Sequence, residues 1–394
     1  MISFEKGGIY LRKVAIIGVG STEIRSTTPD VSYKEMMFEA ATKAYEDAGI
    51  DPRKDVDSFI TSAEDYWEGY SIFDEFVPDQ LGAVLKPVFT VSADGLFGII
   101  NAYMQIRTGL IDIAVVEAHS KASDMLTFEG IVAFALDPIY NRPLGGHPFY
   151  IAGLEMMRYL CETDTTLEEC AMVVVKNKKN ALDNPYAAFG AKITVEDVLN
   201  SEPMFHPLKR LEISPLADGA IVMVLAAEEV AKRLTDTPIW VKGVGWCSDT
   251  PQLESRDWGR AIYAEISAKM AYKMAKITQP QKEIDLVEID DKFSYKELQH
   301  MEALGLCERG EAGILLREGA TQRDGDLPVN PSGGSLGCGN LLEADGLKKA
   351  MELVLQLRGE AGKRQVPDAK TGVAQVWRGI PTATGAVVIL SREY

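Results

Sequence analysis

Ser92 occupies the position in this sequence where the residue types and their spacing most clearly indicate chemistry. Residues 89–92 (FTVS) are predicted to end a β-strand, and residues 96–107 are predicted to form a helix with apolar side chains on most sides. A helix of that kind is buried. Its first turn would present free N–H groups and the positive end of the helix dipole to Ser92. Such surroundings lower the pKa of a nucleophile or stabilise an oxyanion, but serine is also a common N-cap, and the local sequence leaves both interpretations open.

The elements that position Ser92 alternate between strand and helix. Residues 13–19 (KVAIIGV) form a short β-branched run that predicts a buried strand. Residues 32–48 have apolar side chains at helical spacing, with Ser32 suited to cap the start of the helix and Gly49 suited to end it. Alternation of this kind predicts a mixed or parallel sheet that is covered by helices.

The order of strand, helix and strand occurs a second time in the later part of the chain. This self-similarity predicts a duplicated βαβ-type unit. We therefore expect an α/β fold of two repeated halves, with an inserted, partly helical lid that is rich in Pro, Asn and aromatic residues. The predicted ranges are 1–235 for the N-terminal half, 236–394 for the C-terminal half, 141–211 for the lid, and 238–244, 262–274 and 286–289 for the repeated strand, helix and strand.

Composition excludes several classes of partner. The formal net charge is −17 and the pI is about 4.8, so a nucleic acid or an anionic membrane surface, each of which needs a dominant basic patch, is not expected as the main partner. Residues 1–13 contain no apolar stretch of signal-peptide length, and no run is long enough to span a bilayer. The five cysteines form no C-x-x-C pair, which argues against a disulfide framework or a structural zinc site. A reduced, cytoplasmic location is expected.

Ordered blocks of the sequence resemble the thiolase superfamily over nearly the whole chain. In that superfamily a cysteine opens the buried helix, a later block reads His-Asp-x-Phe or Asn-Glu-x-Phe, and another reads Asn-Pro-x-Gly-Gly followed by Gly-His-Pro. The lid is similar to that of thiolases of the sterol-carrier-protein-x type. The matching stretches are 91–123 around Ser92, 176–187 in the lid, 214–225 at the end of the first half, 287–305 (VEIDDKFSYKELQHMEALG), 330–347 (NPSGGSLGCGNLLEADGL) and the closing strand 385–390.

Several positions depart from the catalytic pattern that this resemblance implies. A thiolase uses a cysteine thiolate as acyl carrier, a second cysteine or a histidine to move the α-proton, and His or Asn groups to bind the thioester oxyanion. Here Ser92 stands in the nucleophile position, Asp290 in that of the His or Asn of the Phe block, and Asn340 in that of the Gly-His-Pro histidine. The last loop, residues 377–384 (WRGIPTAT), contains neither Cys nor His. A serine needs an adjacent base that no motif histidine supplies, so Ser92 is predicted to be a poor acyl carrier, whereas Asn340 keeps an amide donor.

The resemblance implies an enzyme whose substrate is a coenzyme A thioester, with no metal in this chain. Thiolase-like aldolases of steroid side-chain breakdown also lack the nucleophilic cysteine. They cleave β-hydroxyacyl-CoA by a retro-aldol reaction and work with a small zinc-ribbon and OB-fold partner of the DUF35 type. We therefore expect an acyl-CoA carbon–carbon lyase or transferase with a homodimeric core and a DUF35 partner. Two alternatives remain open, a two-subunit β-ketoacyl-CoA thiolase and a non-catalytic acyl-CoA-binding or scaffold subunit.

Candidate site residues follow from the same reading. A retro-aldol reaction needs a base for the β-hydroxyl and a donor for the resulting enolate. Adjacent aspartates also suggest a metal, but the spacing supplies no further oxygen ligands. The predicted catalytic set is Ser92, Asp290, Asp291, Asn340 and His147, with Asp94 or a tyrosine as further candidates for the base, and the predicted coenzyme A contacts are Lys179, Lys209 and Arg210 for the phosphates and the backbone of Gly385 for an oxyanion.

Overall fold

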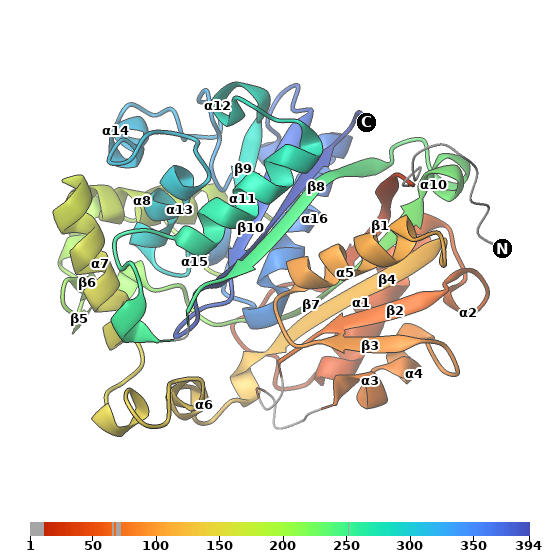
Figure 1. The fold of residues 1–394 in the computed structure, drawn as a ribbon, viewed down its shortest axis with the longest axis horizontal. Helices are drawn as coiled ribbons and strands as arrows, with labels where there is room; N and C mark the ends of the chain where they lie inside the picture. The colour runs from red at the N-terminus through yellow and green to blue at the C-terminus, as the bar shows by residue number, and fades with distance from the viewer. Residues whose placement is uncertain (1–11, 65–66, 68–71, 251) are drawn as a thin grey trace.

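The computed structural model describes residues 12–64, 67, 72–250 and 252–394. Most of the segment that was predicted to carry no targeting signal lies outside these residues. One nine-stranded mixed sheet runs through the molecule, in the order β3-β2-β4-β7-β1-β8-β11-β10-β9 (Figure 1). Its strands are β1 (Val14–Ser21), β2 (Ser58–Ser62), β3 (Val88–Val91), β4 (Ile113–Lys121), β7 (Asp218–Ala227), β8 (Ile239–Ser248), β9 (Leu286–Glu288), β10 (Thr371–Trp377) and β11 (Thr384–Ser391).

The strand order confirms the predicted duplication. Read outward from the β1–β8 contact, the first half runs β1, β7, β4, β2, β3, and the second half runs β8, β11, β10, β9. At the outer edge of the second half, in the position that corresponds to β3, an isolated parallel bridge joins Val287 and Val329. A long helix precedes the third strand of each half in this order, α5 (Gly95–Arg107) before β4 and α16 (Asp345–Arg358) before β10. The fold is therefore two copies of one α/β unit, and the exact boundary near residue 235 stays a prediction.

Alternate side chains along a strand point to opposite faces of the sheet, and different helices pack against each face. In β1, Val14 and Ile16 join the core that contains α5 and α16, whereas Ala15 and Ile17 join the core formed with α1 (Tyr33–Ala48). The second half packs its other face against α11 (Ile262–Ala275) and α13 (Ser294–Ala303). The helices α5 and α16 thus lie between the two halves of the sheet, so residues at their first turns lie inside the molecule.

The predicted helix at 32–48 is confirmed together with both of its ends. Ser32 caps α1 in a capping box with Glu35, and Gly49 ends it in the left-handed conformation at φ 66°. Glycine adopts that conformation without the steric cost of a Cβ. The remaining short helices are α2 (Pro52–Asp55), α3 (Phe73–Phe76), α4 (Pro78–Leu81), α10 (Glu228–Leu234), α12 (Pro280–Glu283), α14 (Ala312–Arg317) and α15 (Gly334–Cys338).

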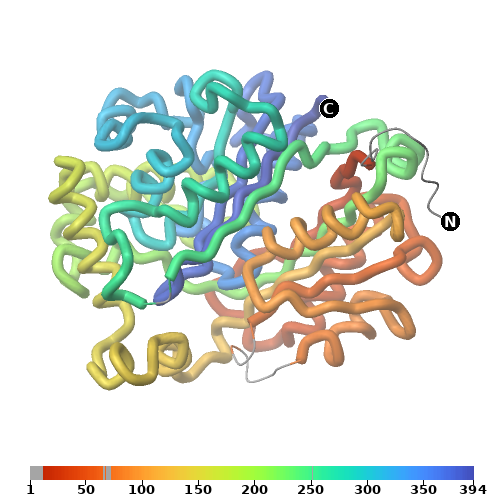
Figure 2. The backbone as a smooth tube through the Cα atoms, in the orientation of Figure 1, coloured from red at the N-terminus to blue at the C-terminus, as the bar shows by residue number. Residues whose placement is uncertain are grey.

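The inserted segment occupies residues 122–217, between the neighbouring strands β4 and β7, and so begins earlier than the predicted lid. It lies beside the C-terminal half of the chain, where the yellow and yellow-green parts meet the cyan part in Figure 2, and α8 packs against α13 and α15. It contains α6 (Phe128–Phe134), α7 (Tyr150–Thr163), α8 (Leu167–Ala181), α9 (Val195–Leu199) and the two-stranded sheet of β5 (Pro203–Phe205) and β6 (Leu208–Lys209).

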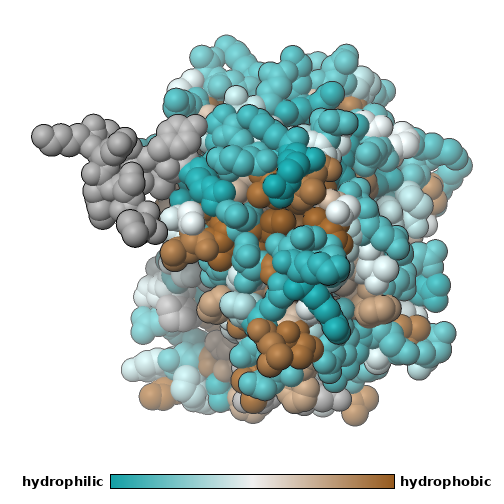
Figure 3. Space-filling model, turned by 90° about the vertical axis from the view of Figure 1, so that its right-hand side faces the viewer, coloured by the Kyte–Doolittle hydropathy of each residue, from teal (hydrophilic) through white to brown (hydrophobic). Residues whose placement is uncertain are grey.

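The outer surface reflects the charged composition. The face shown in Figure 3 is mainly hydrophilic, with patches of hydrophobic residues among the polar ones. Among the residues that the structure describes, no helix is long and apolar enough to cross a membrane.

Candidate active site

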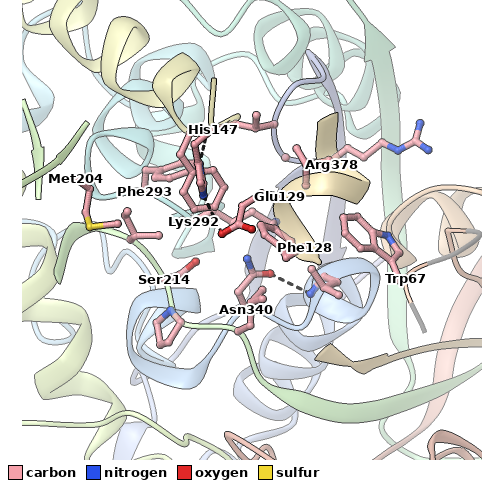
Figure 4. Close-up of a pocket in the computed structure, with 18 of the residues that line it drawn as sticks. Trp67, Phe128, Glu129, His147, Met204, Ser214, Lys292, Phe293, Asn340 and Arg378 are labelled. Atoms are coloured by element: carbon pink, nitrogen blue, oxygen red, sulfur yellow. Dashed lines mark hydrogen bonds and ion pairs between the residues drawn. The ribbon is translucent and has the colours of Figure 1, made fainter. Parts of the chain in front are cut away.

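A cavity of about 490 Å³ lies where the inserted segment meets the ends of the core elements (Figure 4). One group of lining residues is polar and comes from the core, and a second group is aromatic and comes mainly from the insertion and the loops beside it. The insertion also contributes the polar residues Glu129, His147, Lys178 and Arg210. We call the first group the core end, which consists of Asp94, Lys292 and Asn340. We call the second group the aromatic wall, which consists of Trp67, Phe128, Phe149 and Phe293.

Asp94 caps α5 and is 2% exposed. Its carboxylate accepts hydrogen bonds from the backbone N–H of Leu96 at 2.9 Å and from that of Gly346, at the start of α16, at 3.0 Å. Burial raises the pKa of Asp94 to about 7, because removal from water disfavours the charged form more than nearby Lys292 favours it. A carboxyl group with this pKa exchanges protons at neutral pH, which suits a general base.

Asn340 presents an amide N–H donor to the cavity. It follows α15, and its backbone N–H donates to the carbonyl oxygen of Pro215 at 2.8 Å. Its Oδ1 accepts from the backbone N–H of Leu342 at 2.9 Å, which fixes the orientation of the amide. The Nδ2 consequently points into the cavity (Figure 4), and no residue in the described part of the chain accepts a hydrogen bond from it. This arrangement suits an oxyanion donor.

Lys292 supplies a buried positive charge at the core end, and the sequence reasoning missed it. Its Nζ donates to Asp290 Oδ2 at 2.6 Å, to the carbonyl oxygen of Trp377 at 3.1 Å and to Asp345 Oδ2 at 3.3 Å. Burial on its own would lower the pKa of Lys292, but Asp290 and Asp345 outweigh burial and raise it, so the side chain stays an ammonium ion. The sequence does place Lys292 directly after two aspartates in a block that also carries apolar residues, and this pattern could have indicated a buried lysine that is paired with a carboxylate.

Asp290 and Asp291 are both fully buried, and neither lines the cavity. Burial would raise the pKa of Asp290, but Lys292 and Lys349 together with His300 outweigh burial and hold the pKa below its ordinary value. Asp291 instead accepts from the backbone N–H groups of Ser335 at 2.6 Å and Leu336 at 3.1 Å, at the start of α15. The geometry therefore connects Asp290 with the cavity through Lys292, and Asp291 with the loop that carries Asn340.

His300 holds the main chain at Asp290. Its Nδ1 lies 2.9 Å from the carbonyl oxygen of Asp290, so Nδ1 carries the proton and donates. Its Nε2 accordingly accepts from the hydroxyl of Tyr263 at 2.9 Å. Burial lowers the pKa of His300 to about 3, so the ring stays neutral. This histidine positions the strand end that carries Lys292 and does not line the cavity.

His147 lies on the cavity beside the aromatic wall. Its Nε2 is 3.2 Å from Glu129 Oε1, and its ring centroid lies 4.9 Å from that of Phe149. The rings of the wall contact one another in sequence, with centroids 5.6 Å apart for Trp67 and Phe128, 5.8 Å for Phe128 and Phe149, and 5.3 Å for Phe149 and Phe293. These residues come from separate loops and helices and carry no periodic signal in the sequence.

Ser92 is exposed and is not among the residues that line the cavity. The interpretation of Ser92 as the cap of the buried helix is wrong, because α5 begins at Gly95 and the carboxylate of Asp94 accepts the hydrogen bond at its first turn. Ser92 lies in the bend that joins β3 to α5. Its predicted role as a poor acyl carrier stays a prediction.

The predicted coenzyme A contacts are dispersed. Arg210 lines the cavity, is largely exposed and lies 3.7 Å from Glu202. Lys209 at the end of β6 and the exposed Lys179 of α8 do not line it, whereas Lys178, the neighbour of Lys179, does. Gly385 lies within β11, paired with Trp377 of β10 on one side and Cys247 of β8 on the other. A cradle for the nucleotide is therefore not assembled from these four residues.

An ion pair between Arg378 and Glu64 closes one side of the cavity. Arg378 follows β10 in the second half, and Glu64 follows β2 in the first half. The backbone N–H of Glu64 also donates to Glu343 Oε1 at 2.9 Å. The two halves of the fold are thus joined directly beside the candidate site. No group of three or more His, Cys, Asp or Glu side chains among the described residues is arranged to hold a metal ion.

Comparisons with known proteins identify the family. A family model described as Thiolase C-terminal domain-like matches residues 245–392. An acetyl-CoA acetyltransferase of Methanothermobacter thermautotrophicus is 37% identical over 390 residues, which is 97% of this chain and 100% of that protein. The chain belongs to the thiolase superfamily. A thiolase-superfamily protein from Thauera aromatica, benzoylsuccinyl-CoA thiolase subunit BbsB, is 29% identical over 361 residues, covering 90% of this chain and 91% of its own length.

Among solved structures, the Ltp2-ChsH2(DUF35) aldolase superposes with a TM-score of 0.82 at 25% identity, covering 96% of this chain and 97% of that one. Human mitochondrial 3-ketoacyl-CoA thiolase superposes with a TM-score of 0.73 at 17% identity, over 96% of this chain and 99% of that one, which shows the shared fold. The predicted family and fold are both confirmed. The protein is a thiolase-superfamily enzyme.

Proposed function

We propose that this thiolase-superfamily protein cleaves a carbon–carbon bond of a β-hydroxyacyl-CoA by a retro-aldol reaction, without a covalent acyl-enzyme. The observation that carries the proposal is the contrast between two neighbours. Ser92, in the nucleophile position, is exposed and lies off the cavity, whereas Asp94 lines it with a pKa of about 7. The bend after β3 thus offers the substrate a proton acceptor and no acyl carrier.

In the proposed reaction the Asp94 carboxylate takes the proton of the β-hydroxyl group. The bond between the α and β carbons then breaks, the β carbon becomes the carbonyl carbon of a released aldehyde or ketone, and the bonding electrons pass to the thioester as an enolate. The Nδ2 of Asn340 donates a hydrogen bond to the enolate oxygen. Lys292 contributes only its positive charge, because its three N–H groups are donated to Asp290, Asp345 and the carbonyl oxygen of Trp377. Protonated Asp94 returns its proton to the α carbon, which yields a shortened acyl-CoA and restores the carboxylate.

We further propose that the protein acts as a homodimer with a small zinc-ribbon and OB-fold subunit. The structural similarity to the Ltp2-ChsH2(DUF35) aldolase supports this proposal, as does the similarity to subunit BbsB, which is itself named as a subunit. A second candidate function is thiolysis of a β-ketoacyl-CoA. The names of relatives such as the acetyl-CoA acetyltransferase at 37% identity favour it, but it needs an acyl carrier other than the exposed Ser92.

The two functions differ in what they consume and release. The purified protein, with and without the small partner, is incubated either with a β-hydroxyacyl-CoA alone or with a β-ketoacyl-CoA and free coenzyme A. Release of an aldehyde or ketone from the first substrate supports the retro-aldol reaction. Formation of two acyl-CoA products from the second mixture only would overturn it in favour of thiolysis.

A further inference from the structure

The aromatic wall and the core end belong to different parts of the fold. The three residues of the core end come from both halves of the fold. Asp94 caps α5 in the first half, and in the second half Lys292 follows β9 and Asn340 follows α15. Phe128 and Phe149 belong to the segment inserted between β4 and β7. The other two members of the wall lie outside the insertion, since Phe293 directly follows Lys292 and Trp67 lies between β2 and α3. The insertion therefore adds aromatic surface, together with polar residues such as His147 and Arg210, to the polar groups of the core end.

Three of the four rings of the wall are not ordinary core residues, whereas Phe293 is 3% exposed and belongs to the core. Phe59 and Phe73, which fill the core beside α1, are both 0% exposed. Trp67, Phe128 and Phe149 are instead only half-buried, although they contact one another in a continuous row. All three line the cavity. Aromatic surface left uncovered in a concave site is the usual feature of a pocket that binds a hydrophobic ligand.

The size of the cavity indicates which part of a CoA thioester covers this surface. In the proposed reaction Asn340 binds the thioester oxygen at the core end, and the wall begins at Phe293, directly after Lys292. An acetyl group has a single methyl carbon beyond the carbonyl and would leave most of a cavity of about 490 Å³ and its wall uncovered. A ring-bearing acyl group would cover the wall with edge-to-face and stacked ring contacts.

We propose that the aromatic wall is the acyl-binding surface and that it selects a bulky hydrophobic acyl group carrying a ring. This inference rests on the proposed function, because it requires a CoA thioester in the cavity. Phe128 is its specificity-determining residue, since its ring lies between those of Trp67 and Phe149.

The test is a set of dissociation constants, measured by titration calorimetry for free coenzyme A, acetyl-CoA and 3-phenylpropanoyl-CoA. Burying a phenyl ring in an apolar site is expected to tighten binding about ten- to a hundredfold over acetyl-CoA. Phe128→Ala should reduce that ratio severalfold. Phe134→Ala is the matched control, because Phe134 lies on the same helix, is 75% exposed and does not line the cavity.

The outcomes separate this inference from the proposed function. Equal affinities for acetyl-CoA and 3-phenylpropanoyl-CoA would overturn the acyl-binding role of the wall while leaving acyl-CoA binding intact. The same conclusion follows if Phe134→Ala lowers the ratio as much as Phe128→Ala does. Absence of binding by all three compounds would overturn both proposals together.

Discussion

Replacing Asp94 with asparagine separates its structural role from its chemical role. Asparagine is as good an N-cap as aspartate, so the Asp94→Asn variant should keep the hydrogen bond from Leu96 at the start of α5. The amide does not titrate and is not a base. Loss of a general base costs about 10²- to 10⁴-fold in rate. We therefore expect a folded protein whose carbon–carbon cleavage falls by that factor.

The raised pKa of Asp94 also predicts how the stability of the Asp94→Asn variant, relative to wild type, changes with pH. Burial raises the pKa of Asp94 to about 7 from its ordinary value of 3.8, so the folded state holds this proton more tightly than the unfolded state. Between pH 3.8 and about pH 7, Asp94 is ionised in the unfolded state but still protonated in the folded state. The stability that the protonated carboxyl contributes is therefore fully present below the unfolded pKa and is lost as the pH rises through about 7. The asparagine variant has no such loss. Relative to wild type, its free energy of unfolding should be greater at pH 8 than at pH 5, by on the order of 2–3 kcal/mol.

Two assays check these expectations. Denaturant unfolding at pH 5 and pH 8 gives the stability difference, and kcat/KM from pH 5 to pH 9 gives the activity profile. Wild-type activity should rise with a midpoint near pH 7, because the base must be ionised, and the variant should show residual activity with no such midpoint. Full activity in Asp94→Asn with an unchanged profile would refute the reasoning and leave Asp94 as a cap only.

Asp218→Asn is the matched control, since it makes the same change at a fully buried aspartate that lies off the cavity. Burial raises the pKa of Asp218, but hydrogen bonds from Ser123 and Thr28 and the charge of Lys121 outweigh burial and lower it. Its contribution to stability is therefore present above the unfolded pKa and is lost only as the pH falls through the lower folded pKa. The control should be less stable than wild type at both pH 5 and pH 8, with the activity midpoint unmoved.

Three further substitutions test the remaining roles. Ser92→Ala should retain wild-type cleavage of a β-hydroxyacyl-CoA to within about threefold, because the serine lies off the cavity; a loss comparable to that of a catalytic nucleophile, measured as kcat, would restore Ser92 to the mechanism. Asn340→Ala should lower kcat by about 10²- to 10³-fold with little change in KM, since an oxyanion donor acts in the transition state, and a change confined to KM would contradict that role. Lys292→Met should destabilise the protein by about 3–5 kcal/mol in urea unfolding, because it leaves Asp290 buried without its partner, and an unaltered midpoint would show that the pair is dispensable.

The predictions that held from the sequence rest on local or repeated patterns. The capping box of Ser32 and the left-handed Gly49 depend only on near neighbours, so the bounds of α1 followed from the sequence. The duplication followed from a strand and helix order that occurs twice, and the closing strand β11 from its apolar run. Ordered motif blocks of a superfamily added the connectivity.

The site resisted prediction because its interactions join distant parts of the chain. Asp94 accepts from Gly346, 252 residues away, and Lys292 contacts Asp345, 53 residues away. Ser92 seemed the better candidate than Asp94 because motif position was available in the sequence, whereas burial and the start of the helix at Gly95 were not. The aromatic wall combines residues from an insertion, a loop and the start of α13, so no spacing in the sequence indicates it.

The central claim is that carbon–carbon cleavage proceeds without transfer of an acyl group to the protein or to a second coenzyme A. The most direct measurement is the rate of aldehyde or ketone release from a β-hydroxyacyl-CoA as a function of added free coenzyme A, with the small partner present. A retro-aldol reaction predicts release at zero added coenzyme A and no acceleration as its concentration rises. A rate that is zero without coenzyme A and increases with its concentration would contradict the claim.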